Sequence, residues 1–214
     1  MKIPHTPPLI FPFEPLVDEL AGKGYAIWDD FLTPAETALL RREAVASFRE
    51  GDFRAAGVGQ GEDYQKNKRV RGDHIRWVDR ATMPPAGHFF LDRLAEFITY
   101  LNRTCFVGIR DQELHFAIYP AGAFYKRHLD VFQNKQSRKF SVICYLNDEW
   151  TSEDGGQLRL YLPRPGGGED TLDVLPRGGR LVCFQSDRYE HEVLPARRER
   201  YSLTGWLTDE RPLL

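Results

Sequence analysis

Two histidines and one aspartate in the C-terminal half of the chain have the types and the spacing of a metal site. His128 and Asp130 form a His-x-Asp pair within HLDVF, and His191 lies far downstream in DRYEHEVLP. Two imidazoles and one carboxylate on one face of a metal suit non-haem Fe(II), because they leave neighbouring coordination positions open for a co-substrate and O2. These residues therefore indicate oxidation at an iron centre.

The His-x-Asp pair fits the end of a β-strand, where residues i and i+2 point to the same side. His191 must then come from a distant strand that folds back beside the first. A strand predicted at 200–207 has alternate residues on one face, and so does a strand predicted at 140–146. These two faces carry Arg200, Ser202, Thr204 and Trp206, and Ser141, Ile143 and Tyr145.

Arg200 on such an inward face needs an anion, because an unpaired charge in the interior costs several kcal/mol. The same strand face has no acidic residue. A dicarboxylate co-substrate would supply the partner, held by both arms of the planar guanidinium.

Each residue has a simpler interpretation when it is taken alone. Arg200 could belong to a surface cluster with Arg197 and Arg198, and His128 could be a structural histidine. The combined pattern favours the metal and anion site over both. His115 has no partner at ligand spacing, so we expect it to be structural.

Composition limits the function classes. A chain of 214 residues suits one well-filled domain or two small ones, and a formal net charge of −2 gives no attraction to nucleic acid or to anionic membrane. The odd number of cysteines without CxxC spacing predicts neither a disulfide framework nor a structural zinc site. No apolar run approaches the roughly 20 residues of a membrane span. We therefore expect a cytoplasmic protein.

Helical and strand patterns divide along the chain. A proline-rich arm is expected at residues 4–15 and helices at 15–21, 33–50 and 85–104. Strands are expected at 24–32, 73–78, 114–120, 139–147, 155–163, 179–186 and 200–207, with turns at 162–170 and 175–180. Helices followed by a run of strands predict an α+β, mostly β fold, with helices packed on one side of a β-sandwich or jelly roll.

Residues 51–72 differ from the rest. Glycine is frequent, apolar periodicity is absent, and the end is basic. The segment could be a solvated loop, or it could be a mobile lid over residues 52–72, since long structureless loops in compact domains are often functional.

Several motifs together resemble one family. They are RGDHIRW (71–77), YPAGAFYKRHLD (119–130), CYLNDEW (144–150), GGQLRLYLP (155–163), FQSDRYEHEVLPA (184–196) and RYSLTGWL (200–207). In order and spacing they resemble the 2-oxoglutarate- and Fe(II)-dependent dioxygenases, and within them the branch of the hypoxia-inducible-factor prolyl hydroxylases. The resemblance implies a double-stranded β-helix core over 111–214, supported by helices and the lid in 1–110, as one domain over 1–214.

The resemblance also implies roles for individual residues. His128, Asp130 and His191 would bind iron, and Arg200 would pair with the distal carboxylate of 2-oxoglutarate. The implied co-substrate pocket further contains Tyr145, Thr204 and Tyr119, and the implied substrate contacts are Arg138, Trp206, Asp73 and Tyr125. We expect Asp73 and Arg138 to form an ion pair that anchors the lid.

The implied reaction is protein prolyl 4-hydroxylation, in which 2-oxoglutarate and O2 yield succinate, CO2 and a hydroxylated proline. Fe(II) would be the metal, with ascorbate a candidate further cofactor. Compactness resembles the bacterial members, for which elongation factor Tu is the implied protein substrate. Oxygen sensing is a further role that the resemblance implies.

Other functions remain to be weighed. A hydroxylase of the same fold could act on a small molecule or on another side chain, and a catalytically inactive metal-binding module could keep the fold. Halogenation is disfavoured, because that chemistry replaces the ligand carboxylate and Asp130 is present. A nucleic-acid demethylase would need a basic groove with stacking aromatics, and no such run occurs.

Overall fold

A computed structural model of the protein describes residues 12–57, 69–131 and 137–210. Most of the proline-rich arm expected at 4–15 lies outside these ranges. So does the middle of the lid expected at 52–72. The expected lid is therefore described only at its two ends.

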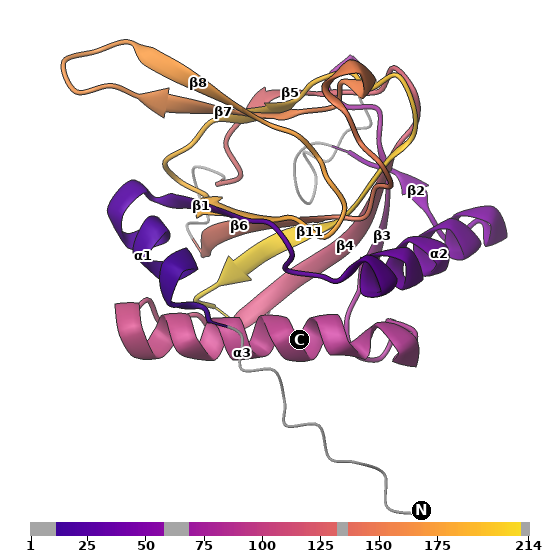
Figure 1. Ribbon diagram of the computed structural model, residues 1–214, viewed down its shortest axis with the longest axis horizontal. Helices are drawn as coiled ribbons and strands as arrows, with labels where there is room; N and C mark the ends of the chain where they lie inside the picture. The colour runs from indigo at the N-terminus through magenta and orange to yellow at the C-terminus, as the bar shows by residue number, and fades with distance from the viewer. Residues whose placement is uncertain (1–11, 58–68, 132–136, 211–214) are drawn as a thin grey trace, which may run out of the picture.

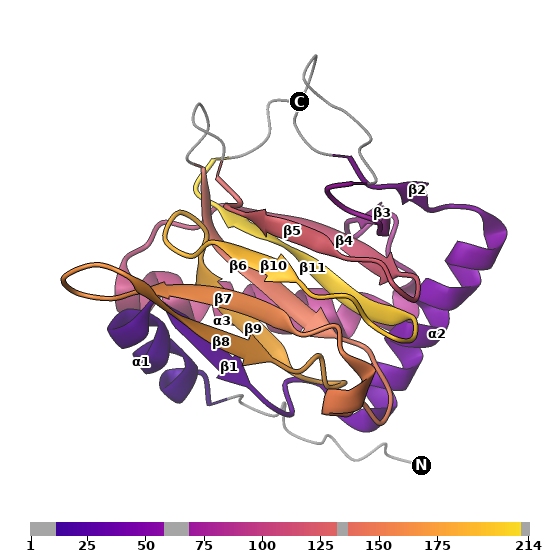
Figure 2. The ribbon, with the colours of Figure 1, turned by 90° about the horizontal axis from the view of Figure 1, so that it is seen from above.

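Two antiparallel sheets lie face to face (Figures 1 and 2). Within the described residues the large sheet has seven strands in the order β1 (Tyr25–Trp28), β9 (Leu181–Gln185), β6 (Arg138–Tyr145), β11 (Arg200–Thr208), β4 (Asp111–Tyr119), β3 (His74–Val78) and β2 (Arg54–Ala55). The small sheet has four, in the order β5 (Tyr125–His128), β10 (His191–Val193), β7 (Leu158–Pro163) and β8 (Glu169–Val174). This arrangement agrees with the predicted double-stranded β-helix.

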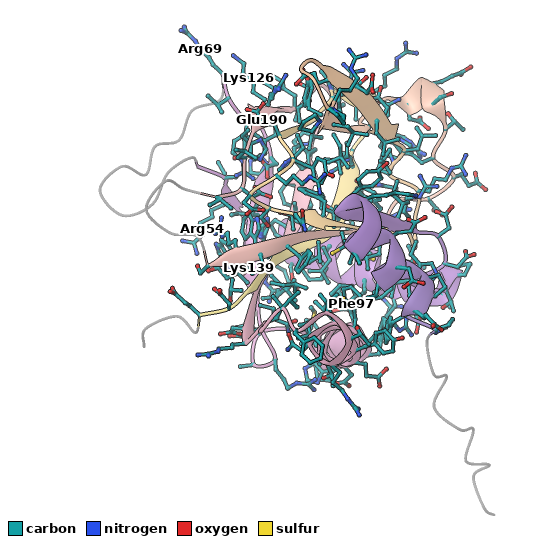
Figure 3. All side chains as sticks on the ribbon, turned by 90° about the vertical axis from the view of Figure 1, so that its left-hand side faces the viewer. Arg54, Arg69, Phe97, Lys126, Lys139 and Glu190 are labelled. Atoms are coloured by element: carbon teal, nitrogen blue, oxygen red, sulfur yellow. The ribbon has the colours of Figure 1, made fainter. Side chains whose placement is uncertain are left out.

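Helices cover the outer face of the large sheet. They are α1 (Glu14–Lys23), α2 (Pro34–Glu50) and α3 (His88–Cys105), with short 3-10 turns at Pro85–Gly87 and Ser152–Asp154. Figure 1 shows α3 lying beneath the sheet, and Figure 3 looks along it with Phe97 labelled. Phe97 is fully buried in one apolar cluster with Phe116 and Leu203 of the sheet. Burying this face is the main stabilising contribution of the helical layer.

The inner face of the large sheet packs against the small sheet. Ile143 of β6 and Phe184 of β9 form a second apolar cluster with Leu158 and Leu160 of β7. Alternation along each strand therefore divides the side chains between the helices and the space between the sheets. The candidate site lies in that inner space.

The sequence predicted most elements but missed β8 and the two-residue strand β2, which lies within the expected lid. Residues 162–170 were expected to be a turn, whereas the turn is limited to the residues after Pro163 and a strand begins at Glu169. The strand β8 is exposed over most of its length and lies at the sheet edge. Acidic side chains protect such an edge but remove the apolar alternation by which a strand is recognised.

The N-terminal part of the chain is also more than a helical support. Its strands β1, β2 and β3 form the two outer regions of the large sheet. The large sheet therefore contains strands from both sides of residue 110, the position where the β core was expected to begin. Among the described residues, no helix combines the length and the apolar character needed to cross a membrane.

A capping box begins α2, at the start of the helix expected over 33–50. The Thr33 hydroxyl accepts a hydrogen bond from the Glu36 amide at 3.2 Å, and the Thr33 amide donates to Glu36 Oε2 at 2.8 Å. Arg93 of α3 donates to Glu36 Oε1 at 2.6 Å. Glu36 therefore joins the start of α2 to the helix beneath the sheet.

Replacing Thr33 by alanine should lower the free energy of unfolding by about 1 kcal/mol, because the Glu36 amide loses its acceptor. Urea denaturation at a constant m-value measures the change. Thr33→Ser keeps the hydroxyl and should remain within a few tenths of a kcal/mol of the parent. Equal stability of the alanine variant would contradict the capping role.

Candidate functional site

His128, Asp130 and His191 come together between the two sheets. His128 ends β5, Asp130 follows two residues later, and His191 begins β10 directly opposite His128 in the antiparallel register. Asp130 Oδ1 lies 3.4 Å from His128 Nε2, and Asp130 Oδ2 lies 3.5 Å from His191 Nε2. One ligand atom from each residue lies within 4.8 Å of the others. The three side chains can therefore reach one ion.

Backbone carbonyls fix the orientation of both imidazoles. His128 Nδ1 lies 2.7 Å from the carbonyl oxygen of Lys126, and His191 Nδ1 lies 3.2 Å from that of Tyr189. A carbonyl only accepts, so each Nδ1 carries a proton, and Nε2 is the atom of each ring that would bind a metal. This second hydrogen bond is the usual support of a metal-binding histidine. The donor set thus fits a divalent metal such as Fe(II).

The charge states also suit metal binding. Burial lowers the pKa of His191 to about 4, so its imidazole is neutral near pH 7. Burial alone would raise the pKa of Asp130, but His191, His128 and a hydrogen bond from Ser141 together hold it well below its usual range. A neutral imidazole and an ionised carboxylate are the forms that bind a metal.

Arg200 is buried without an anionic partner among the described residues. The side chain of Arg200 is 1% exposed, its Nε donates to the Gly156 carbonyl at 3.0 Å, and its Nη2 has no hydrogen-bond partner there. The rings of Tyr119 and Tyr145 each lie 5.0 Å from the guanidinium carbon. The buried Tyr145 hydroxyl likewise has no partner in the described ranges. A carboxylate of a small ligand would satisfy both groups.

Gly156 allows Arg200 to approach so closely. Gly156 has a φ of 67°, and a Cβ there would lie 2.9 Å from Ala196 Cβ and 3.2 Å from Arg200 Cδ. A side chain at this position would therefore disturb both the left-handed backbone and the arginine.

A narrow cavity of about 50 Å³ lies beside the three candidate ligands. Its lining includes Tyr119, Ser141, Thr204 and Trp206. The Thr204 hydroxyl is held by the Val142 carbonyl at 3.1 Å. A larger hollow of about 820 Å³ lies between α2 and residues 146–151, but none of the three candidate ligands lines it. The chemistry therefore lies in the smaller cavity.

An aromatic wall forms the other side of this cavity. Ring centroids of His115 lie 4.8 Å from Trp77 and 5.5 Å from Trp206, and the Arg138 guanidinium lies 3.5 Å above the Trp206 ring. Burial lowers the pKa of His115 to about 3, so the ring is neutral. His115, which the sequence suggested as merely structural, thus lines the cavity without joining the metal-ligand cluster.

The expected ion pair between Asp73 and Arg138 is wrong. Asp73 instead accepts two hydrogen bonds from Arg71, at 2.7 Å from Nε and 2.6 Å from Nη2. Arg138 donates to Glu113 at 2.7 Å. Asp73 precedes β3 and Arg138 begins β6. Two strands lie between β3 and β6, a distance of about 14 Å across the sheet, and the register also places the two residues at opposite ends of β11. An arginine side chain does not span that distance.

Arg71 is a site residue that the sequence analysis missed. The Arg71 guanidinium lies 4.1 Å from the Tyr125 ring, and that ring stacks on His128 with a centroid distance of 3.6 Å. Arg71 also donates to the Gly57 carbonyl at 3.3 Å, so it joins both described ends of the expected lid. Arg71 opens the motif RGDHIRW, and its position two residues before Asp73 permits a local pair, but no role was assigned to it.

Comparisons with known proteins agree with this geometry. Residues 114–208 match the model of the 2OG-Fe(II) oxygenase superfamily. The chain is similar to a prolyl-4-hydroxylase of Pseudomonas putida, with a TM-score of 0.80 and 38% identity over 92% of this chain and 98% of that one. A prolyl hydroxylase of Trichoplax adhaerens, solved with a hypoxia-inducible-factor peptide fragment, gives a TM-score of 0.78 and 30% identity over 91% of this chain and 87% of that one.

A curated relative is the hypoxia-inducible factor prolyl hydroxylase of Caenorhabditis elegans. It is 31% identical over 92% of this chain and 28% of its own length. The chain spans between 28% and 60% of the length of this protein and the Egl nine homologs that it matches.

Asp73→Asn should lower the free energy of unfolding by about 3 kcal/mol or more, because the buried Arg71 loses its counter-charge. Thermal or urea denaturation measures the loss. Asp92→Asn is the matched control: it breaks the Arg80–Asp92 pair, whose side chains are 58% and 60% exposed. Such exposed pairs contribute at most about 1 kcal/mol. Equal effects of the two substitutions would show that burial of the Arg71 pair has no energetic consequence.

Proposed function

We propose that this chain, which belongs to the 2OG-Fe(II) oxygenase superfamily, is an Fe(II)- and 2-oxoglutarate-dependent prolyl 4-hydroxylase acting on a proline in a loop of another protein. The observation that carries the proposal is the buried guanidinium of Arg200, without an anion among the described residues. It lies 5.0 Å from the ring of Tyr119, which lines the cavity beside His128, Asp130 and His191. When bound, iron, 2-oxoglutarate and O2 supply the oxidation that yields succinate, CO2 and one added oxygen atom on the substrate.

Each protein residue has a role in this proposal. His128, Asp130 and His191 would hold the iron through two Nε2 atoms and a carboxylate oxygen. Arg200 would bind the distal carboxylate of 2-oxoglutarate, with the Tyr145 hydroxyl as a second donor. Thr204 and Tyr119 would shape the pocket around the co-substrate. Ascorbate is proposed as the reductant that keeps the iron ferrous between turnovers.

Residues at the cavity rim support a protein substrate. Within the described ranges the exposed large apolar side chains are Trp77, Phe106 and Leu129. Trp77 packs against His115 with tilted rings, and Leu129 lies between two of the candidate ligands in the sequence. Exposed apolar groups beside a site are typical of protein contact surfaces. The cavity is also too small to enclose a whole second substrate, which favours insertion of a single side chain.

The other candidate substrate contacts surround the same rim. Trp206 and Arg138 form its aromatic and cationic edge, and Tyr125 covers His128. Asp73 would act through Arg71 and not by touching the substrate, because both its oxygens accept from that guanidinium. Figure 3 shows the basic Arg54, Arg69 and Lys126 on one side of the molecule, where the acidic Glu190 also lies.

Elongation factor Tu is the proposed substrate protein. The support is the sequence resemblance to compact bacterial prolyl hydroxylases, together with 38% identity to the Pseudomonas putida prolyl-4-hydroxylase. The Trichoplax adhaerens neighbour was solved with a peptide fragment, which agrees with a substrate presented as an extended segment.

Arg200→Ala should weaken 2-oxoglutarate binding about 30-fold or more, because a desolvated carboxylate loses a charge-assisted partner worth about 2–5 kcal/mol. Arg200→Lys should be milder, since an ammonium cannot reproduce the fork. Calorimetric titration of metal-loaded protein measures both. Arg198→Ala is the matched control, because Arg198 is half exposed and pairs with Asp154. Equal affinity of the parent and Arg200→Ala would contradict the clamp.

Elongation factor Tu incubated with the enzyme, Fe(II), 2-oxoglutarate and ascorbate should gain one oxygen atom on a single proline, with one succinate formed per hydroxylation. Mass spectrometry of peptides locates the modification. His191→Ala should abolish it, because two ligands hold iron poorly. If a cell extract shows another modified protein, only the substrate assignment is wrong. If no proline in any protein is modified, the small-molecule alternative replaces the proposal.

A further inference from the structure

Two buried serines form a hydrogen-bonded chain that ends on Asp130. Ser141 of β6 donates from Oγ to Asp130 Oδ2 at 2.6 Å, and Ser186 Oγ lies 2.9 Å from Ser141 Oγ. Ser141 is 2% exposed and Ser186 is fully buried. Neither residue is among the candidate ligands.

The single proton of each hydroxyl fixes the direction of donation along these hydrogen bonds. Ser141 has one proton, and an ionised carboxylate can only accept, so that proton points at Asp130. Ser186 must therefore donate to Ser141. Successive donation in one direction polarises each hydroxyl and strengthens the bond to the carboxylate.

The serines are held more rigidly than the aspartate. Ser141 pairs with Phe184 of β9 and Trp206 of β11 in the centre of the large sheet. The Ser186 amide donates to the Lys139 carbonyl at 3.0 Å. Asp130 instead follows β5 of the small sheet, outside any strand. The large sheet thus holds a carboxylate that the small sheet carries.

The bond from Ser141 distinguishes the two oxygens of Asp130. Oδ2 has one of its lone pairs occupied by the short bond, whereas Oδ1 receives no bond from either serine. A freely turning carboxylate could bind a metal through both oxygens and would then fill an extra coordination position. Two imidazoles and a carboxylate bound through one oxygen leave three positions of an octahedral ion open.

We propose that Ser141 and Ser186 are positioning residues that restrict Asp130 to binding the metal through one oxygen, and so keep the third position open. The proposal rests on the proposed iron site. A bidentate 2-oxo acid needs two open positions and O2 needs another, so loss of one would block one of these partners. The alternative is that the hydroxyls only satisfy a buried carboxylate and leave its mode of binding unchanged.

Manganese(II) provides a test that needs neither turnover nor a substrate protein. Water-proton relaxation of Mn(II)-loaded protein, without 2-oxoglutarate, reports the number of exchanging waters on the metal. Ser141→Ala should lower the relaxivity per bound Mn(II) by about one third, as three water positions become two. Ser186→Ala should cause a smaller fall, because Ser141 can still donate to Asp130.

Two further variants separate positioning from a general effect. Ser141→Thr keeps the hydroxyl on a strand and should restore the parent relaxivity. Ser47→Ala removes another buried serine hydroxyl, which accepts from Arg76 on the outer side of the large sheet, and should leave the relaxivity unchanged.

The outcomes are distinct. Parent relaxivity in a folded, Mn(II)-loaded Ser141→Ala protein overturns the positioning role while leaving the proposed function intact. Loss of Mn(II) binding in both alanine variants also overturns it, because the hydroxyls would then be needed to form the site and not to restrict the carboxylate. If the parent protein itself binds no divalent metal, the proposed function is wrong, and the positioning role is wrong with it.

Discussion

The antiparallel pairing of β5 with β10 is the constraint on which the site depends. It sets His191 directly opposite His128, although these residues are far apart in the chain. Side chains alternate between the two faces of a strand, so a slip of one residue would turn one imidazole away from the other. The register shifts just after His191, and such bulges are common beside active sites because they redirect a side chain.

The large sheet forms the other side of the site, because its two faces carry different kinds of side chain. One face buries apolar residues against the helices, and the other carries both apolar and polar groups toward the small sheet. Arg200, Ser141 and Ser186 are all buried there. Burying polar groups is costly unless they are paired. Ser141 is paired with Asp130 and Ser186 with Ser141, whereas the Arg200 guanidinium keeps an atom without a partner in the described ranges. The site is therefore complete for a metal and incomplete without an anion.

Arginine pairs around the rim show how the surrounding structure supports this space. Arg71 connects Asp73, the Tyr125 ring and the Gly57 carbonyl, while Arg138 connects Glu113 and the Trp206 ring. Each guanidinium uses both its charge and its flat face. An ammonium could not make the same contacts, because it has no plane to stack and no fork of donors.

The sequence by itself determined the residue types and local patterns. His-x-Asp, the distant His191 and the alternation around Arg200 could be recognised, because ligand chemistry and strand periodicity are local properties. The tertiary structure alone decided which side chains meet across strands. Strand order keeps Asp73 away from Arg138, and the end of β9 brings Ser186 to Ser141 of the neighbouring β6. Such contacts depend on register and on sheet order, and neither is written in the spacing of residues along the chain.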